Sequence, residues 1–179
     1  MIIVPIKKIS NKLAFRFFDC GNVDLNLYLQ QFAYANDVVG MSKTFICLDD
    51  ERKSIIGYYT LCASCVMSIN MPANIRKRLP KYPCPCAKIA RLAVDLRFQK
   101  QHFGKELLKD AIKRIITASN SIGIYGILVD AKDEAQSFYE HYSFIRLKKD
   151  SSEYLLPIVT AIKALQLSEP TNKSTNNSK

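Results

Sequence analysis

The 179-residue chain contains no long hydrophobic run and no segment arranged like a secretory signal. A helix needs about 20 consecutive apolar residues to span a membrane, and no stretch approaches that length. At the N-terminus the apolar run MIIVPI comes before its lysines, whereas a secretory signal places its basic residues first. We therefore expect a soluble, cytoplasmic protein that does not enter a membrane.

A convincing metal motif is also lacking, although the chain has six cysteines. Cys62 and Cys65 have the spacing of zinc ligands, and Cys84 and Cys86 follow them. The segment GYYTLCASCVMSI, however, has the composition of a strand, in which residues three apart face opposite sides of the sheet. A zinc knuckle requires a tight turn between its cysteines. We predict reduced, mostly buried thiols and no metal.

The remaining composition is that of one globular domain, with 48% hydrophobic and 23% charged residues and no internal repeat. A chain of this size buries roughly 70% of its unfolded surface, which is enough for a hydrophobic core. We expect a single domain over residues 1–167. The segment SEPTNKSTNNSK, residues 168–179, has no apolar residue that could anchor it, so we predict a disordered tail.

Hydrophobic periodicity predicts a mixed α/β fold in which strands and helices alternate in the second half. In the first half we expect a strand over residues 2–9, a helix from about Val23, two strands within 43–69 joined by a charged turn at 49–53, and a short basic helix among the prolines at 72–85. A strand through Val94 and a helix from about Phe103 follow. The chain then continues with a strand at 126–132, a helix at 133–142, a strand at 143–149, and a strand with a helical end from 153.

Two of these helices carry an apolar stripe. The first has Asn22 as its N-cap, and its stripe consists of Leu25, Leu29, Phe32 and Ala33. The second helix is longer and has charges on its opposite face; its stripe consists of Phe103, Leu107, Leu108, Ala111, Ile112, Ile115 and Ile116.

Positive charge is in excess and unevenly placed. The net charge is +10, from 26 basic and 16 acidic residues. Residues 74–88 contain no acid, and a second basic cluster, RLKK, spans residues 146–149. Such clusters suit a polyanion such as nucleic acid or a phosphorylated cofactor, although a basic surface without a particular partner is equally compatible. The basic residues of the first cluster are Arg76, Lys77, Arg78, Lys81 and Lys88.

The stretch RLAVDLRFQKQHFGKELLKDA joins a predicted strand to a predicted helix through a polar turn. Backbone N–H groups from Gln99 to Gly104 and the helix dipole would together bind an anion such as phosphate or pyrophosphate. Lys100, Lys105 and His102 add positive side chains. Any strand–turn–helix shares this geometry, so the turn alone does not establish a phosphate site.

Tyr139 lies in the segment DEAQSFYEHYSF, on the helix after the next predicted strand. Parallel strands bring their C-terminal ends to one edge of a sheet, where ligands bind, so we expect Tyr139 near the turn that follows Val94. A tyrosine hydroxyl is a weak acid that can hand a proton to a leaving thiolate. The alternative is that Phe138, Tyr139 and Tyr142 only pack on the sheet.

Several motifs in sequence order resemble one superfamily. ARLAVDLRFQKQHFGKELLKDA followed by GILVDAKDEAQSFYEHYSF resembles the acetyl-CoA core of the GCN5-related N-acetyltransferase (GNAT) superfamily. FDCGNVDLNLYLQQ, IIGYYTLCASCV, LPKYPCPCAKIARLAVD and FYEHYSF are similar to toxin acetyltransferases of bacterial toxin–antitoxin pairs. The resemblance runs from Phe18 to Phe144. It implies the α/β GNAT fold, a mixed sheet of about six or seven strands, splayed at the acetyl-CoA site and flanked by helices.

The resemblance implies roles for two segments. The backbone of Leu92, Ala93 and Val94 would hydrogen-bond the pantetheine arm and the acetyl carbonyl. The family's phosphate loop runs Arg or Gln, two residues, Gly, one residue, Gly or Ala. His102 occupies the position of the middle glycine. Because backbone amides make the phosphate contacts, a side chain at this position is tolerated if the φ angle of His102 is negative. The loop here reads Gln99, Lys100, Gln101, His102, Phe103 and Gly104, followed by Lys105, and of these the terminal Gln99 and Gly104 match the pattern.

The resemblance also implies a mechanism. Tyr139 would protonate the departing CoA thiolate, whereas the asparagine that usually precedes its helix is missing near Lys132 and Asp133. We find no convincing general base, and none is required, because an α-amine with a reference pKa of about 8 is partly neutral at physiological pH.

The acceptor implied by the resemblance is the α-amino group of aminoacyl-tRNA, whose acetylation blocks translation. The basic segment from Arg76 to Lys88 suits the tRNA backbone. The implied partner is an antitoxin with a ribbon–helix–helix DNA-binding end, and a homodimer would suit a two-sided tRNA surface. Two other functions are compatible with the sequence: a GNAT enzyme that acetylates protein amines or a small amine, and a catalytically silent fold that binds CoA or a partner, with His102 as the lesion.

Overall fold

A seven-stranded sheet organises the part of the chain that the structure describes. The computed structural model describes residues 1–10, 12–51, 54–77 and 79–168. The strand order is β1-β2-β3-β4-β5-β7-β6, and β4 and β5 form the parallel pair in an otherwise antiparallel sheet. The predicted mixed α/β fold is thereby confirmed. The strands are β1 Ile2–Pro5, β2 Lys43–Leu48, β3 Ile55–Met67, β4 Pro83–Val94, β5 Gly126–Asp130, β6 Ile145–Arg146 and β7 Glu153–Pro157.

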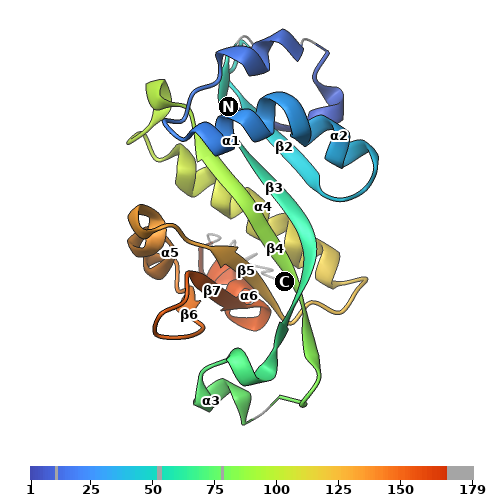
Figure 1. The fold of residues 1–179 in the computed structure, drawn as a ribbon, viewed down its shortest axis with the longest axis vertical. Helices are drawn as coiled ribbons and strands as arrows, with labels where there is room; N and C mark the ends of the chain where they lie inside the picture. The colour runs from blue at the N-terminus through green and yellow to red at the C-terminus, as the bar shows by residue number, and fades with distance from the viewer. Residues whose placement is uncertain (11, 52–53, 78, 169–179) are drawn as a thin grey trace, which may run out of the picture.

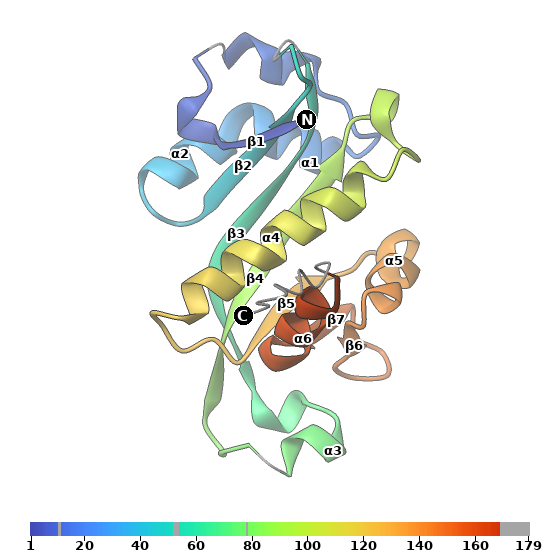
Figure 2. The same cartoon turned by 180° about the vertical axis from the view of Figure 1, so that it is seen from behind.

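Helices cover both faces of this sheet. The front face, toward the viewer in Figure 1, carries α1 and α2. Figure 2 shows α4 and α6 on the back face. The α-helices are α1 Val23–Leu27, α2 Ala33–Val38, α3 Ala73–Arg76, α4 Phe103–Ser119, α5 Gln136–His141 and α6 Ile158–Ser168; the other helical segments are η1 Ile6–Lys8, η2 Lys12–Phe17, the π-helical η3 Tyr28–Phe32, η4 Ser68–Asn70, η5 Leu96–Phe98 and η6 Asp133–Ala135.

The back of the sheet packs against α4, as its predicted stripe requires. Leu107, Leu108, Ala111 and Ile115 are buried against residues of β3, β4 and β5. Each of the three larger side chains, Leu107, Leu108 and Ile115, contributes about 1.5–3 kcal/mol. The fully buried Tyr59 on β3 also donates a hydrogen bond to Asp110 of α4. The long helix that carries the polar turn is therefore fixed to the sheet along its length.

The front of the sheet packs against α1, η3 and α2, and here one predicted side chain is misplaced. Asn22 caps α1 as expected, because its side chain accepts a hydrogen bond of 3.1 Å from the N–H of Leu25. Leu29 and Ala33 are buried, but Phe32 is 49% exposed. The π-helical turn of η3 adds a residue per turn, which rotates Phe32 outward and places Tyr28 in the core.

Some predicted boundaries were too long. The first strand ends at Pro5, where a 3-10 turn begins, and the strand predicted at 143–149 comprises only Ile145–Arg146. The predicted disordered tail lies outside the described residues except for Ser168, which ends α6. Within the described ranges, no helix is long and apolar enough to cross a membrane.

Strands β3 and β4 continue past their neighbours as a two-stranded arm with α3 at its tip (Figure 1). Cys62 pairs with Lys88 and Cys65 with Pro85, so the two cysteines face opposite sides of β3, as predicted. Cys84 and Cys86 are buried, Cys62 is half-buried, and Cys65 is exposed. Burial raises the pKa of the Cys86 thiol to about 11.

Candidate active site

The parallel strands β4 and β5 separate before β4 ends. Their pairing stops at Ile89 and Val129, while β4 continues to Val94. A cleft of about 440 Å³ opens at this point. It is bounded on one side by residues 89–94 of β4 and on the other by Asp130, Ala131 and Tyr139. The splay expected from the sequence is therefore present.

The open edge of β4 offers backbone hydrogen-bonding groups to this cleft. The N–H of Asp95 donates to the carbonyl of Ile56 at 2.9 Å. The backbone N–H and C=O groups of Asp95, and of every second residue before it, therefore point toward β3. Leu92 and Val94 therefore turn theirs toward the cleft. The backbone of Ala93 already pairs with Tyr58, so Ala93 cannot contribute the hydrogen bonds that we predicted for it.

A bulge in β4 determines which side chains enter the cleft from the front. Thr60 pairs with Arg91 and Leu61 pairs with Ile89, which leaves Ala90 without a cross-strand partner. A bulge of this kind shifts the side-chain alternation by one residue. The side chains of Ile89 and Leu92 therefore both pack in the core between the sheet and α4, whereas the side chain of Arg91 lies on the front of the sheet.

The polar turn before α4 presents five free backbone donors. The N–H groups of residues 100–104 donate no hydrogen bond to any group in the described part of the chain. Four of these residues line a second cavity, of about 560 Å³: Lys100, His102, Phe103 and Gly104. This cavity also includes Phe138 and Tyr142 of α5 and shares Val94, Gln99 and Glu134 with the first. Free N–H groups at a helix start are suited to a phosphate or pyrophosphate.

The backbone of this turn differs from our expectation at His102. Its φ angle is +65°, and that of Lys100 is +60°, so both residues adopt the left-handed conformation. The negative φ that we set as the condition for tolerating His102 is therefore not met. Left-handed residues of this kind are typical of the backbone nests that bind anions. The turn keeps the geometry that glycine would give, at a cost of about 1–2 kcal/mol for each non-glycine residue.

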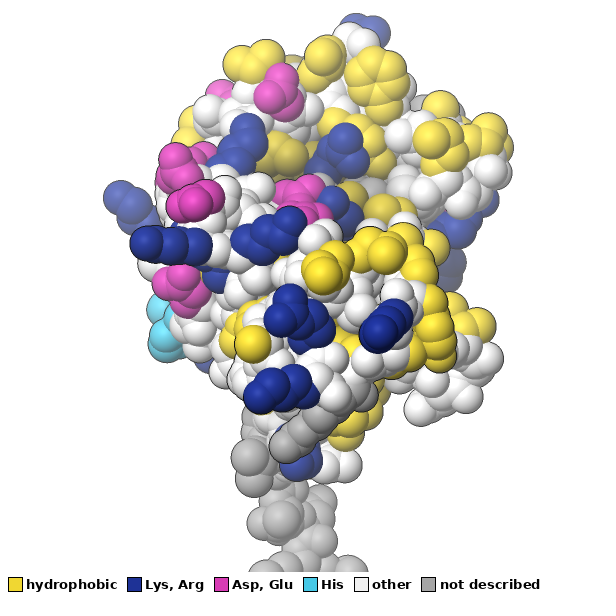
Figure 3. Space-filling view, turned by 60° about the horizontal axis from the view of Figure 1, so that its bottom comes forward, with side chains coloured by type: hydrophobic (Ala, Val, Ile, Leu, Met, Phe, Trp, Pro, Cys, Tyr) yellow, Lys and Arg dark blue, Asp and Glu magenta, His cyan; other side chains and the backbone are white. Residues whose placement is uncertain are grey.

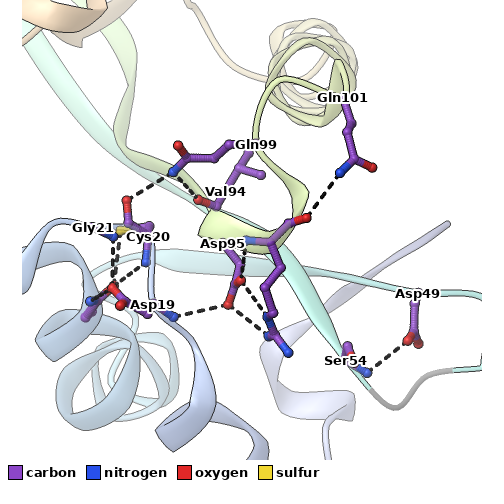
Figure 4. Close-up of polar contacts among 11 residues, drawn as sticks. Asp19, Cys20, Gly21, Asp49, Ser54, Val94, Asp95, Gln99 and Gln101 are labelled. Carbon is purple, nitrogen blue, oxygen red and sulfur yellow. Dashed lines mark hydrogen bonds and ion pairs between the residues drawn. The ribbon is translucent and has the colours of Figure 1, made fainter.

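Gln99 is held in the wall of the cleft by its own side chain. Its Nε2 donates to the carbonyl of Val94 at 3.0 Å and to the carbonyl of Cys20 at 3.1 Å (Figure 4). The first bond satisfies a carbonyl that β5 leaves unpaired. The second joins the segment before α1 to the end of β4. The side chain of Gln99 is thus used to build the cleft, while the free backbone donors of the turn begin at Lys100.

Tyr139 projects into the cleft from α5. It is 7% exposed, and its ring packs edge-on against Phe138 and Phe144. Within the described part of the chain its hydroxyl has no hydrogen-bond partner, so it remains available to a ligand. Burial raises the pKa of Tyr139 to about 12, and the hydroxyl therefore keeps its proton at physiological pH. Tyr142 and Phe138 are half-buried and line the neighbouring cavity instead.

Comparison with known proteins explains this arrangement. Residues 76–160 match the acetyltransferase (GNAT) domain family. A tRNA-acetylating toxin of Mycobacterium tuberculosis (strain ATCC 25618 / H37Rv) is 38% identical over 139 residues, which are 77% of this chain and 82% of that toxin. The chain belongs to the GNAT acetyltransferases and is homologous to the tRNA-acetylating toxins.

Solved structures of toxin acetyltransferases share the fold of this GNAT chain. AtaT complexed with acetyl-methionyl-tRNAfMet has a TM-score of 0.80 at 26% identity, covering 93% of this chain and 98% of that one. AtaTR bound with AcCoA has a TM-score of 0.77 at 26% identity, covering 92% and 97%. A tyrosine-to-phenylalanine mutant of AtaT bound to the C-terminus of the antitoxin AtaR has a TM-score of 0.78 at 25% identity, covering 94% and 98%.

The basic residues predicted to bind nucleic acid separate into two groups in this acetyltransferase. Arg76, Lys77 and Lys81 are exposed on the arm, at the end of the molecule shown in Figure 3, where many Lys and Arg side chains are visible. Lys88 lies on the front of β4, where its Nζ is 2.5 Å from Oδ2 of Asp130. Arg78 lies outside the described residues.

The second basic cluster, at residues 146–149, is not a uniform polyanion surface. The guanidinium of Arg146 hydrogen-bonds a core residue, because it donates to the hydroxyl of the fully buried Tyr154 at 2.6 and 2.8 Å. Lys148 and Lys149 remain exposed in the turn between β6 and β7. The sequence could not show this difference, because all three residues are basic and Tyr154 pairs with Arg146 only through the sheet.

Sequence reasoning missed a carboxylate that anchors the GNAT cleft. Asp95 is 1% exposed and accepts hydrogen bonds from the N–H of Asp19 and from the backbone and side chain of Arg97. Burial raises the pKa of Asp95, but the bonds from Arg97 and Asp19 outweigh it, and the pKa lies below its ordinary value. The sequence contained a signal for this role: Asp95 directly follows an apolar strand, at a position where its carboxylate can cap the helical turn that begins there.

Proposed function

We propose that this acetyltransferase transfers the acetyl group of acetyl-CoA to the α-amino group of aminoacyl-tRNA and thereby blocks translation. The observation that carries the proposal is the position of Tyr139. Its protonated side chain lines the same cleft as the open edge of β4, where Leu92 and Val94 turn their backbone groups into the cleft. A family member with this arrangement is equipped to bind a thioester and to protonate its leaving group.

The residues present fit acetyl-CoA over its length. The five free N–H groups at residues 100–104 suit the pyrophosphate, and the positive charges of Lys100 and Lys105 lie beside them. The backbone groups of Leu92 and Val94 suit the amide groups of the pantetheine arm, which would lie in the splay like an additional strand. The two cavities are adjacent and share Val94, Gln99 and Glu134, so one extended ligand could reach from one to the other.

Transfer requires one bond to form and one to break. The neutral α-amine attacks the thioester carbonyl, and the cleft contributes by holding the two groups together, an effect worth about 7–11 kcal/mol in favourable cases. The N–H of Val94 would stabilise the oxygen that becomes negative. The carbon–sulfur bond then breaks and Tyr139 gives its proton to the thiolate. The ammonium that formed on attack loses its excess proton to water, and Tyr139 regains a proton from water, which restores the enzyme. Proton transfer of this kind typically contributes about 10²–10⁴-fold.

The partners of this chain follow from the same proposal. Aminoacyl-tRNA is the acceptor, and an antitoxin binds the acetyltransferase and inhibits it; the toxin AtaT, similar in fold, is bound by AtaR. The antitoxin of this chain would carry a ribbon–helix–helix DNA-binding end, and a homodimer would offer tRNA two basic arms. Residues 1–167 would act as a single catalytic domain, without a metal.

A labelling experiment tests the proposed function. The protein is incubated with radiolabelled acetyl-CoA and a pool of charged tRNA, and the label is sorted by amino acid after separation of the tRNA. We expect label in the aminoacyl group and none on uncharged tRNA. Label only on protein lysines or N-termini, or on a small amine added as competitor, would instead make this a GNAT enzyme for another acceptor. Absence of acetyl-CoA binding in calorimetry would make it a silent fold.

A further inference from the structure

The front wall of the cleft contains a cation that the reaction scheme does not use. Arg91 lines the cleft, and the bulge at Ala90 turns it toward α1 and η3, away from α4. The carbon at the centre of its guanidinium lies 3.6 Å from the centre of the Tyr28 ring. This short distance places the cation directly on the face of the ring, the geometry of a cation–π contact.

Tyr28 is a rigid support for this cation. It is 5% exposed, its hydroxyl lies 3.1 Å from the hydroxyl of Ser42, and its ring stacks on that of Tyr58 with an interplanar angle of 21°. A guanidinium on an aromatic face keeps its N–H edge free for planar, bidentate recognition. The arrangement therefore fixes Arg91 while leaving its donors unused.

No carboxylate neutralises Arg91 within the described residues, in contrast with its neighbours. Asp130 pairs with Lys88, and Asp95 pairs with Arg97. Lys132, the other cation that lines the cleft, has Asp24 at 4.0 Å. Arg91 makes neither an ion pair nor a hydrogen bond with the described part of the chain. A fixed, unpaired guanidinium on the wall of a cleft is suited to an anionic ligand.

We infer that Arg91, supported by Tyr28, binds the phosphate of the 3′-terminal nucleotide of the aminoacyl-tRNA. The inference rests on the proposed function, since the acceptor amine must lie beside Leu92 and Val94, next to Arg91 on the same strand. The aminoacyl ester joins the amine to the terminal ribose, and the phosphate of that nucleotide is the nearest anion of the acceptor. Arg91 is thus a specificity residue that distinguishes a nucleotide-linked amine from a simple amine.

Minimal acceptors test this role directly. Three acceptors are compared, each with the aminoacyl group that the tRNA assay selects: the aminoacyl-adenosine with a 5′-phosphate, the same compound without it, and the amino-acid methyl ester. For the wild type we expect kcat/KM to be about 10–100-fold higher with the phosphate than without it, as a charge-assisted hydrogen bond allows. In Arg91→Gln this ratio should fall to about one, whereas the methyl ester should react equally with both proteins.

Further variants separate this role from general damage. Arg91→Lys keeps the charge but loses the planar fork, and it should retain part of the preference. Tyr28→Leu should lose most of the preference, and Tyr28→Phe, which keeps the ring, should lose little. Lys113→Gln, on the exposed back of α4, is the charge-matched control. Binding of acetyl-CoA to each variant, measured by calorimetry, should be unchanged and reports whether the cleft is intact.

The outcomes distinguish the two proposals. If the wild type labels charged tRNA but shows no preference for the phosphorylated acceptor, or if Arg91→Gln keeps that preference, the role of Arg91 is wrong and the proposed function stands. If the wild type labels no charged tRNA, both are wrong.

Discussion

The hydroxyl of Tyr154 donates a hydrogen bond of 2.9 Å to Oε1 of Glu140, which joins the fully buried ring on β7 to the helix that carries Tyr139. Arg146 donates to the same hydroxyl and also bonds Gln136 on that helix. The helix, α5, has only six residues and no side-chain cap. Short helices are not stable by themselves, so these contacts fix the position of Tyr139.

Tyr154→Phe should therefore affect both stability and catalysis. Removal of the hydroxyl leaves Arg146 and Glu140 without a shared partner and should lower the free energy of unfolding by about 1–3 kcal/mol. Because α5 is loosened, kcat should fall while the Kd for acetyl-CoA changes little. Tyr59→Phe is the matched control: it removes an equally buried hydroxyl that contacts Asp110 and Arg114 on α4. Comparable loss of kcat in both variants would contradict a specific role for Tyr154.

Tyr139→Phe tests the proton donor. The variant should bind acetyl-CoA normally and transfer acetyl groups about 10²–10⁴-fold more slowly, which single-turnover rates would show. In the wild type, burial raises the pKa of Tyr139 to about 12, so the proton stays in place as the α-amine loses its own near pH 8. The rate should rise through that pH and should not fall again by about pH 10. A descending limb at lower pH would assign the proton donor to another group.

His102→Gly tests the cost of the left-handed turn. Glycine adopts a φ of +65° without steric penalty, so the free energy of unfolding should increase by about 0.5–1 kcal/mol. Acetyl-CoA affinity should change little if the phosphate contacts are backbone N–H groups. His102→Ala keeps the strain and serves as the control in denaturant unfolding. A large loss of affinity in both variants would show that the imidazole itself binds the ligand.

Asp95→Asn tests the buried anchor through its pH dependence. The pKa of Asp95 in the folded protein lies below its unfolded value of about 3.8, because the bonds from Arg97 and Asp19 outweigh burial. Its contribution to stability is therefore present above pH 3.8 and is lost as the pH falls through the folded pKa. Asp95→Asn should be less stable than the wild type at pH 7, and the difference should narrow on acidification. A constant difference in urea unfolding at each pH would refute this account.

The arm can be tested by the salt dependence of tRNA binding. Arg76→Gln/Lys77→Gln should reduce the slope of log Kobs against log salt by about 0.7–0.9 for each phosphate contact that is lost. Lys113→Gln/Lys163→Gln removes the same charge from α4 and α6 and should leave the slope unchanged. Equal effects of the two pairs would mean that total charge, and not the arm, determines binding.

The sequence by itself determined the elements and the family. Periodicity placed the stripe of α4 correctly because each apolar residue on a helix contributes to one face, whatever the rest of the chain does. The order of the motifs from Phe18 to Phe144 was sufficient to predict the splayed sheet, the turn before α4 and the position of Tyr139. These features depend on contacts between residues close in the sequence or on a family pattern.

Only the tertiary structure decided how individual polar residues are used. The bulge at Ala90 reverses the side-chain alternation of β4 and so sends Arg91 to the front, and η3 rotates Phe32 outward while turning Tyr28 inward. Gln99 bonds Cys20, a residue 79 positions away. One inserted residue in a strand or helix changes the direction of every side chain that follows it. A hydrogen bond between distant segments produces no periodic pattern in the sequence. The local pattern therefore predicted the fold and the general site, while register and long-range pairing decided its polar contacts.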